Sequence, residues 1–163
     1  MSWEMQLFAL VEIVVAMFLG GMIGFEREMA KKPAGLRTHM LVAGGAALLV
    51  ALGNVIVLSF GQNIPADNLR SDPIRIIQAI IVGISFLGAG TIFQREKGEQ
   101  IEGLTTSASI LFTAGVGIAV ALQQFLLAIS STILLLLITR ILGVIENRIW
   151  DRAIEKDRTN DGQ

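Results

Sequence analysis

The fold is decided by a run of 37 residues, GLTTSASILFTAGVGIAVALQQFLLAISSTILLLLIT (103–139), that contains no acidic or basic side chain. The hydrocarbon core of a bilayer is about 30 Å thick, and an α-helix needs about 20 apolar residues to cross it. The run is too long for one such helix and long enough for two. Its polar interruption, LQQF (122–125), predicts a tight hairpin between them.

Three other stretches are nearly free of charge. Residues 5–25 carry one ionisable side chain, Glu12, residues 38–66 carry only His39, and residues 76–94 carry none. Hydrophobic residues make up 53% of the chain and charged residues 17%, whereas soluble domains have about 25% charged residues. The mean hydropathy is +0.65. The sequence therefore predicts an integral membrane protein.

The predicted fold class is all-α, with a bundle of five transmembrane helices over residues 1–144 and a short amphipathic C-terminal helix in a cytoplasmic tail at 145–163. The transmembrane helices are expected at about 5–25, 39–60, 74–94, 104–122 and 125–144. Apolar residues recur in the tail at helical spacing between alternating acids and bases. This pattern is typical of a helix that lies at a membrane interface or packs on a partner.

The basic residues are distributed unevenly between the predicted loops. With the N-terminus outside, the inner face holds eleven of the thirteen lysines and arginines, and the outer face holds only Arg70 and Arg75. Basic residues collect in the cytoplasmic loops of membrane proteins. We therefore expect a multi-pass protein whose N-terminus is outside and whose C-terminus is cytoplasmic.

Glu12 is an acidic side chain inside the first predicted helix, about 11 Å from its start at about 1.5 Å per residue. An ionised acid near the bilayer centre costs about 2.5–3.5 kcal/mol, so we expect Glu12 to be protonated or paired, with Gln78 as a partner. It shares a face with Ala16, Gly20 and Gly24, which step by four. A proton or cation site remains open, and so does a buried hydrogen bond or an acid that reaches water.

The fourth predicted helix carries a stripe of small and hydroxylated side chains. They occur at every fourth residue: Thr105, Ser109, Thr113, Gly117 and Ala121. Hydroxyl groups inside a bilayer bond either the preceding helical turn or a neighbouring helix. The stripe can line a water-filled path or form a tight helix–helix seam, and the sequence favours the seam.

The third predicted helix contains GISFLGAG (83–90), in which Gly83, Gly88 and Gly90 remove side chains. Such glycines let another backbone approach closely. They also break helices in transporters. The sequence leaves both interpretations open.

The stretch FEREMAKKPAGLRTHM (25–40) is a charged loop between the first two predicted helices. Glu26 and Arg27 end one helix, while Arg37, Thr38 and His39 begin the next. This group can bind an anion such as phosphate or a lipid head group. It can equally form an ion-pair clamp that holds the hairpin together.

The polar loop at 61–75 carries the carboxylates Asp67 and Asp72, and Asp72 and Arg75 flank the start of the third predicted helix. A helix cap with an interfacial arginine is the simpler interpretation. The two carboxylates are also weak candidates for a Mg²⁺ site, because hard cations prefer carboxylate oxygens. The chain has no cysteine and one histidine, so we expect no cofactor, no catalytic residue and no enzyme.

Five motifs, in this order, resemble the MgtC/SapB family of bacterial inner-membrane proteins: GGMIGFERE (20–28), AGLRTHMLV (34–42), DPIRI (72–76), GISFLGAG (83–90) and GLTTSAS (103–109). The resemblance covers about residues 20–113. It implies a five-helix domain in the bacterial inner (plasma) membrane with its N-terminus outside. It also implies a role in adaptation to magnesium limitation and, in pathogens, in survival inside macrophages, through modulation of membrane machinery such as the proton-driven ATP synthase.

The resemblance also assigns motif positions to individual residues. These are Glu26, Arg27, Gly35, Arg37, Thr38, His39, Asp72, Arg75, Gly88, Gly90, Thr105 and Thr106. Ser85 and Ser107 stand where the family often has glycine and alanine, and both are small enough to keep close packing. Longer members carry a soluble C-terminal regulatory domain, and we expect a short member without it.

Two hypotheses about function follow. The leading one is a non-enzymatic regulator linked to magnesium-limitation adaptation and to membrane-potential or ion homeostasis, which acts by helix–helix contact through its small-residue seams. The expected partners are membrane lipid, other integral membrane proteins and a second copy of the chain in a homo-oligomer such as a dimer, with no nucleic acid. The alternative is an oligomeric conduit for protons or divalent cations, lined by Glu12 and the hydroxyl stripe.

Overall fold

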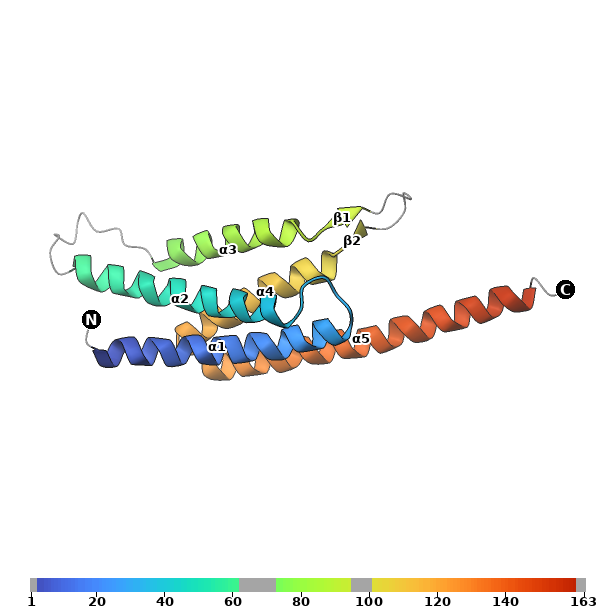
Figure 1. Cartoon of the computed structure of the whole chain (residues 1–163), viewed down its shortest axis with the longest axis horizontal. Helices are drawn as coiled ribbons and strands as arrows, with labels where there is room; N and C mark the ends of the chain where they lie inside the picture. Colours follow the sequence, from blue (N-terminus) through green and yellow to red (C-terminus); the bar gives the residue numbers. More distant parts are fainter. Residues whose placement is uncertain (1–2, 62–72, 95–100, 161–163) are drawn as a thin grey trace. The chain divides into compact units, whose positions relative to one another are not determined.

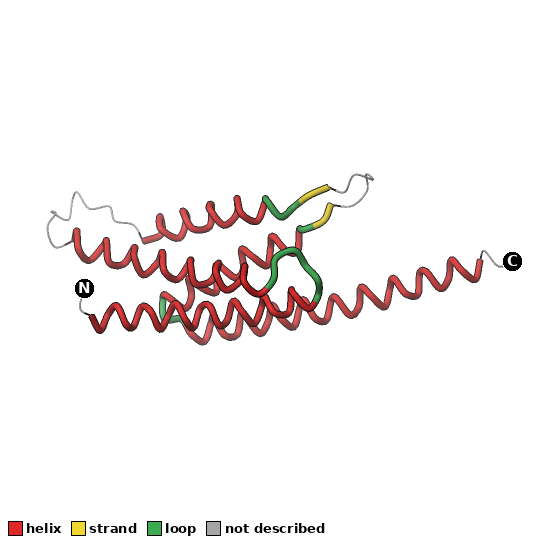
Figure 2. Tube along the Cα trace, in the orientation of Figure 1, coloured by secondary structure: helices red, strands yellow, loops and turns green. Residues whose placement is uncertain are grey.

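The computed structural model of the chain describes residues 3–61, 73–94 and 101–160. It contains, within these ranges, the helices α1 (Trp3–Met29), α2 (Leu36–Gly61), α3 (Pro73–Ala89), α4 (Leu104–Ala121) and α5 (Phe125–Asn160), and the strands β1 (Phe93–Gln94) and β2 (Ile101–Glu102). Helices make up most of this part of the chain (Figures 1 and 2). The predicted all-α membrane bundle is confirmed, with one small addition. The strands form a short antiparallel ladder in which Phe93 pairs with Glu102.

The chain divides into two compact units, Met1–Thr132 and Ile133–Gln163. The first unit contains α1 to α4 and the first two turns of α5, and the second contains the rest of α5. The helix continues without a break past residue 144, where the sequence placed the start of a separate tail. The amphipathic character of residues 145–163 stays a prediction.

Within the described residues, four helices are long and apolar enough to cross a membrane. These are Trp3–Met29, Leu36–Val57, Leu104–Ala121 and Phe125–Gly143. The fifth helix, α3, is apolar but has only 17 residues, or about 25 Å at about 1.5 Å per residue. The chain is therefore a multi-pass membrane protein.

The end of α3 differs from the sequence prediction, which extended this helix to residue 94. Thr91 donates from its backbone N–H (2.9 Å) and from its hydroxyl (2.7 Å) to the carbonyl oxygen of Gly88. These bonds satisfy the last turn of α3 and turn the chain towards β1. Because they are local bonds, a charge-free run gives no sign of them.

The turn between α4 and α5 lies where the polar interruption predicts it. The N–H groups of residues 122–124 donate to carbonyls of the last turn of α4. Gln123 adopts a left-handed φ of 61°, which is uncommon for non-glycine residues. The hairpin therefore closes within three residues.

The first unit is built around α2, which contacts α1, α3 and α4. A Cβ atom at Gly20 would lie 2.5 Å, and one at Gly24 2.7 Å, from a backbone oxygen in or beside α2. On the other side, a Cβ at Gly117 of α4 would overlap the carbonyl of Ala43. Small residues thus let three helices meet backbone to backbone, as is common between membrane helices.

Large apolar side chains cover the outside of this unit. Phe18, Phe86 and Leu126 are 67%, 83% and 84% exposed. Soluble proteins rarely expose so many large apolar groups together. In a bilayer these side chains face lipid, which agrees with the predicted membrane location.

Candidate functional site

The candidate site is a set of polar groups buried between the start of α2 and the start of α4, which we call the His39 junction: Gly35, His39, Thr106 and Ser109. His39 is fully buried. Its Nδ1 lies 2.9 Å from the carbonyl oxygen of Gly35, and its Nε2 lies 3.1 Å from the Ser109 hydroxyl. Ser109 Oγ in turn lies 2.8 Å from the carbonyl oxygen of Thr106.

The chemistry of these partners restricts the protons of the junction. A carbonyl oxygen only accepts, so Nδ1 of His39 carries a hydrogen. In a neutral ring Nε2 accepts from the Ser109 hydroxyl. In a charged ring Nε2 donates, and the hydroxyl turns to donate to Thr106. The Ser109 hydroxyl can therefore satisfy either protonation state of the ring by rotating between Nε2 of His39 and the carbonyl oxygen of Thr106.

A glycine of α1 lets that helix approach the α2 half of the junction. Gly24 lets the beginning of α2 approach α1, because a Cβ at this position would lie 2.9 Å from the Cβ of His39. Ser109 lies in the second turn of α4, on the face that α4 turns towards α2. The sequence singled out both His39 and Ser109, but it did not place them in contact across 70 positions.

An ion pair lies near the junction. Arg27 is 3% exposed, and its Nε and Nη2 donate to the two carboxylate oxygens of Glu26 at 2.5 and 2.8 Å. Because the guanidinium of Arg27 is already bound by Glu26, this geometry disfavours an anion site at these two residues. The pair joins neighbouring residues of α1, so it does not itself clamp the hairpin.

Glu28 makes a polar contact that the sequence did not predict. Its Oε2 accepts from the N–H of Leu36 at 2.9 Å, and Leu36 is the first residue of α2. The first N–H groups of a helix have no partner within it. A side chain at Gly35 would collide with this carboxylate, so the motif glycine makes room for a cap supplied by α1.

The remaining residues of the predicted anion group lie elsewhere. Arg37 is exposed and Thr38 is half-buried. Both line a groove between α2 and α3, and the exposed Arg75 lies at the other end of the same groove. The structure thus divides the charged loop between two places, the His39 junction and this groove.

Glu12 is 6% exposed, and it is nine residues into α1, or about 13 Å from the helix start. Its carboxyl group is hydrogen-bonded by the side chain of Gln123, from the α4–α5 turn. Its Oε1 has no hydrogen-bond partner among the described residues. The prediction of Gln78 as partner is wrong, since Gln78 is exposed on α3.

The hydroxyl stripe of α4 is mostly a packing surface. Thr105 is exposed, whereas Ser109, Thr113, Gly117 and Ala121 are buried. Thr113 donates back to the carbonyl of Ser109 at 2.7 Å, and Gly117 lies against the carbonyl of Ala43. The buried part of the stripe is thus a seam between α4 and α2.

Two of the glycines singled out on the third predicted helix have structural roles: Gly88 allows contact between α3 and α4, and Gly90 lies in the turn after α3. A Cβ at Gly88 would lie 2.6 Å from the Ser107 hydroxyl oxygen, so Gly88 lets the two helices touch. Gly90 lies in the turn that follows α3. The buried Thr106 supplies the carbonyl that accepts from Ser109.

The weak magnesium candidates, Asp67 and Asp72, lie outside the described residues. Within the described ranges, no three histidine or carboxylate side chains converge in a way that would hold a metal ion. The Mg²⁺ site in the 61–75 loop stays a prediction.

Comparison with known proteins gives the chain a family. The sequence profile of the MgtC family matches residues 13–148. SapB of Bacillus subtilis (strain 168) is 33% identical over 159 residues, which are 96% of this chain and 66% of SapB. YhiD of Escherichia coli (strain K12) is 32% identical over 143 residues, 88% of this chain and 64% of YhiD. MgtC of Salmonella typhimurium (strain LT2) is 39% identical over 127 residues, 78% of this chain and 49% of MgtC.

The matches cover most of this chain but only part of each relative. The chain spans about half to two thirds of the length of the relatives it matches. No solved structure matches the chain. The family profile nevertheless covers most of its residues, including the His39 junction, the ion pair and the groove. The resemblance found in the motifs is therefore confirmed: the chain belongs to the MgtC family.

Proposed function

We propose that the chain is a non-enzymatic membrane protein that acts in adaptation to magnesium limitation and in membrane-potential or ion homeostasis, through contact with other membrane proteins. Its family supports the link to magnesium, and the name of the relative YhiD describes it provisionally as a magnesium transporter. One observation favours contact over transport. The polar side chains buried between α1, α2 and α4 are mostly used in hydrogen bonds within and between these helices.

The seam between α2 and α4 carries this argument. The hydroxyls of Ser109 and Thr113 lie 2.8 and 2.7 Å from carbonyls of their own helix. The backbone of α2 fills the place of a side chain at Gly117. A file of water along the stripe would need open space, and the backbone of Ala43 occupies that space at Gly117, so this face of α4 is better suited to packing than to conduction.

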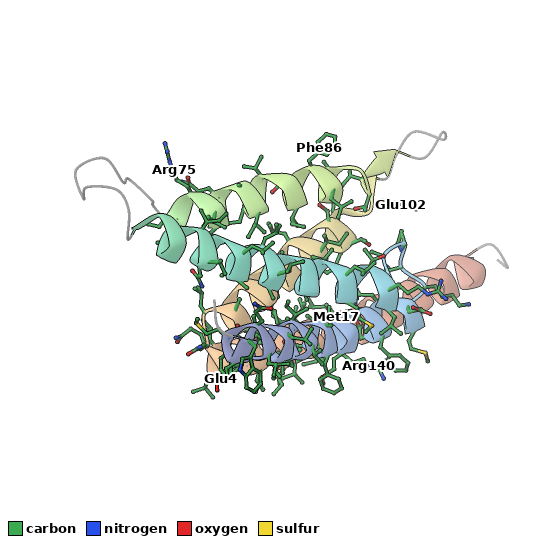
Figure 3. The ribbon with its side chains drawn as sticks, turned by 60° about the vertical axis from the view of Figure 1, so that its left-hand side comes forward. Glu4, Met17, Arg75, Phe86, Glu102 and Arg140 are labelled. Atoms are coloured by element: carbon green, nitrogen blue, oxygen red, sulfur yellow. The ribbon has the colours of Figure 1, made fainter. Side chains whose placement is uncertain are left out.

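The small-residue faces of α1, α2 and α4 already pack against one another within the chain. Contacts with a partner protein therefore need another surface. Val82 and Phe86 lie one helical turn apart on α3 and are 69% and 83% exposed, and Figure 3 shows Phe86 pointing away from the other helices. Such a pair can pack into a neighbouring membrane helix. A second copy of the chain and another integral membrane protein are both partners of this kind.

Complementation under magnesium limitation tests the proposal. A strain without its own family member is supplied with the wild-type chain, with the double variant Val82→Ser and Phe86→Ser, or with the control Phe18→Ser on α1. We expect the double variant to reach the membrane at the normal level but to lose growth and membrane potential at low magnesium. Normal growth of this variant would overturn contact through α3.

The conduit is kept as a second candidate because of one observation, the buried Oε1 of Glu12 without a hydrogen-bond partner among the described residues. Proton and Mg²⁺ fluxes through purified protein in liposomes separate the two candidates, with Glu12→Gln beside the wild type. A wild-type flux that Glu12→Gln abolishes would establish a conduit and overturn the regulator. We expect no flux from either protein.

A further inference from the structure

A groove of about 1020 Å³ lies between α2 and α3, which run side by side in opposite directions (Figure 1). All of its eighteen lining residues are apolar or glycine except Arg37, Thr38 and Arg75. Its volume is at the upper end of the range of about 300–1,000 Å³ for ligand sites. It therefore has the size and the lining of a site for an apolar ligand.

The lining follows the same pattern on both helices. On α2 the residues step by four through Arg37, Leu41, Gly45 and Leu49, and on α3 they step by four through Arg75, Ala79, Gly83 and Leu87. Because the helices are antiparallel, the arginines lie at opposite ends of the groove. Each glycine is eight residues, or about 12 Å, from its arginine. Both glycines therefore lie near the middle of a core about 30 Å thick.

The two glycines have no role in packing within the described chain. A Cβ at Gly45 or at Gly83 would meet nothing within 4 Å. Elsewhere the helices do touch, since a Cβ at Gly53 would overlap the side chain of Ile76. A glycine inside a helix costs about 0.5–1 kcal/mol relative to alanine. These two widen the groove at mid-depth, where an occupant from outside the chain would use the space.

The arginines suit one class of occupant. Arg37 and Arg75 are exposed, and neither has an ion pair with another described residue. Figure 3 shows the side chain of Arg75 extending away from the start of α3. Guanidinium groups bind phosphate through paired hydrogen bonds, and the phosphates of phospholipids lie at the borders of the apolar core. A protein helix would fit the apolar lining, but it would need an acid at each border.

We propose that the groove binds two phospholipids, one from each leaflet, whose phosphates lie on Arg37 and Arg75 and whose acyl chains meet beside Gly45 and Gly83. The Thr38 hydroxyl can donate a second hydrogen bond to the phosphate at Arg37. The lipids are resident ligands that exchange slowly, in contrast to the lipids around the other exposed faces. This inference does not depend on the proposed function.

Native mass spectrometry of the full chain released from detergent counts the retained phospholipids. We expect two in the wild type, one in Arg37→Gln and one in Arg75→Gln. Loss of a hydrogen bond to a charged group weakens the affinity at each site by about tenfold or more. Arg140→Gln is the matched control, because Arg140 is exposed outside the groove, and it retains both lipids.

Filling the groove gives an independent variant. Gly45→Leu with Gly83→Leu removes the space for the acyl chains, and we expect no retained lipid. Gly115→Leu is the control, since a Cβ at Gly115 also meets nothing within 4 Å and Gly115 is not part of the groove. Circular dichroism of all variants establishes that the helices are intact. The arginine variants test the proposal even if the double leucine variant does not fold.

A phospholipid with a photoreactive group at the end of its acyl chain locates the site. In nanodiscs we expect adducts on the peptides around Gly45 and Gly83, and far fewer on the exposed face of α1. Equal labelling of α1, or the same lipid count in every variant, would overturn the proposal. Crosslinks between two copies of the chain at Gly45 would overturn it in favour of a dimer interface, and those to another protein in favour of a partner helix.

Discussion

Gly44 and Gly45 are neighbours in α2 with opposite surroundings. A Cβ at Gly44 would lie 2.5 Å from the side chain of Met17 on α1, whereas one at Gly45 would meet nothing within 4 Å. Two consecutive helical residues point about 100° apart, so one faces the packed side of α2 and the other faces the groove. The comparison shows that glycines in one membrane helix can either bring helices together or keep a space open. It also shows that only the neighbours distinguish the two uses.

The largest expected effect is that of Gly117→Leu, on the packed side. Its side chain would have to displace the backbone of Ala43. Overpacking typically costs about 1–3 kcal/mol and occasionally more, and an obstacle made of backbone puts this variant at the upper end. Unfolding in detergent by SDS titration measures this loss of stability. Gly45→Leu is the matched variant on the open side and should unfold at or above the wild-type midpoint. Equal destabilisation of both variants would contradict the distinction between the two faces.

A second effect tests the polar part of the packed side. His39→Ala removes the partner of Ser109 and leaves a cavity in a fully buried place, so we expect a loss of about 2–4 kcal/mol. The same SDS titration measures it. Arg37→Gln, on the open side of the same helix, should change the stability by less than about 0.5 kcal/mol. An Arg37→Gln protein as unstable as His39→Ala would show that the groove side is equally important for folding.

A third, smaller effect concerns the buried acid. Glu12→Gln replaces a carboxyl group by an amide that can still bond Gln123 and has no charge to bury. We expect a gain in stability of about 1 kcal/mol, read as a higher SDS midpoint. Gln124→Glu, at an exposed position of the same turn, is the control and should change little. A destabilised Glu12→Gln protein would indicate that the carboxylate has a further partner.

The smallest expected effect is that of single glycine-to-alanine substitutions, which compare the open and the packed positions directly. Gly45→Ala and Gly83→Ala add one methyl group in open space, so each should stabilise the protein by about 0.5–1 kcal/mol through its helix propensity. Gly20→Ala, where the new Cβ would lie 2.5 Å from the His39 carbonyl, should instead destabilise it. SDS midpoints of the three single variants decide the sign at each position.

The sequence predicted the parts of this fold that depend on composition along the chain. Runs without charge predicted the spans, and LQQF predicted the α4–α5 turn. It did not predict the end of α3, because two local hydrogen bonds from Thr91 decide it. It also missed the contacts that join distant residues. His39 meets Ser109, and Glu12 meets Gln123 rather than Gln78, because helix rotation decides which polar residues face each other.

For the motif residues, too, the sequence predicted some contacts and not others. Glu26, Arg27 and His39 could be expected near one another, since they flank one short loop. The sequence placed Arg37 and Thr38 in the same group, but the turn of the helix directs them into the groove. No motif predicted that the carboxylate of Glu28 would cap the N–H of Leu36. The sequence does place an acid, Glu28, at one end of the loop and a glycine, Gly35, at the other, which is compatible with such a contact.

The short length of α3 has a consequence for the surrounding membrane. At about 25 Å, this helix is shorter than an average hydrocarbon core of about 30 Å. Hydrophobic mismatch of this kind is relieved when the bilayer thins locally or when flanking side chains snorkel to the interface. Arg75, at the first turn of α3, is placed to snorkel. We therefore expect the bilayer to thin locally beside α3, so that a change in acyl-chain length would act first on this side of the protein.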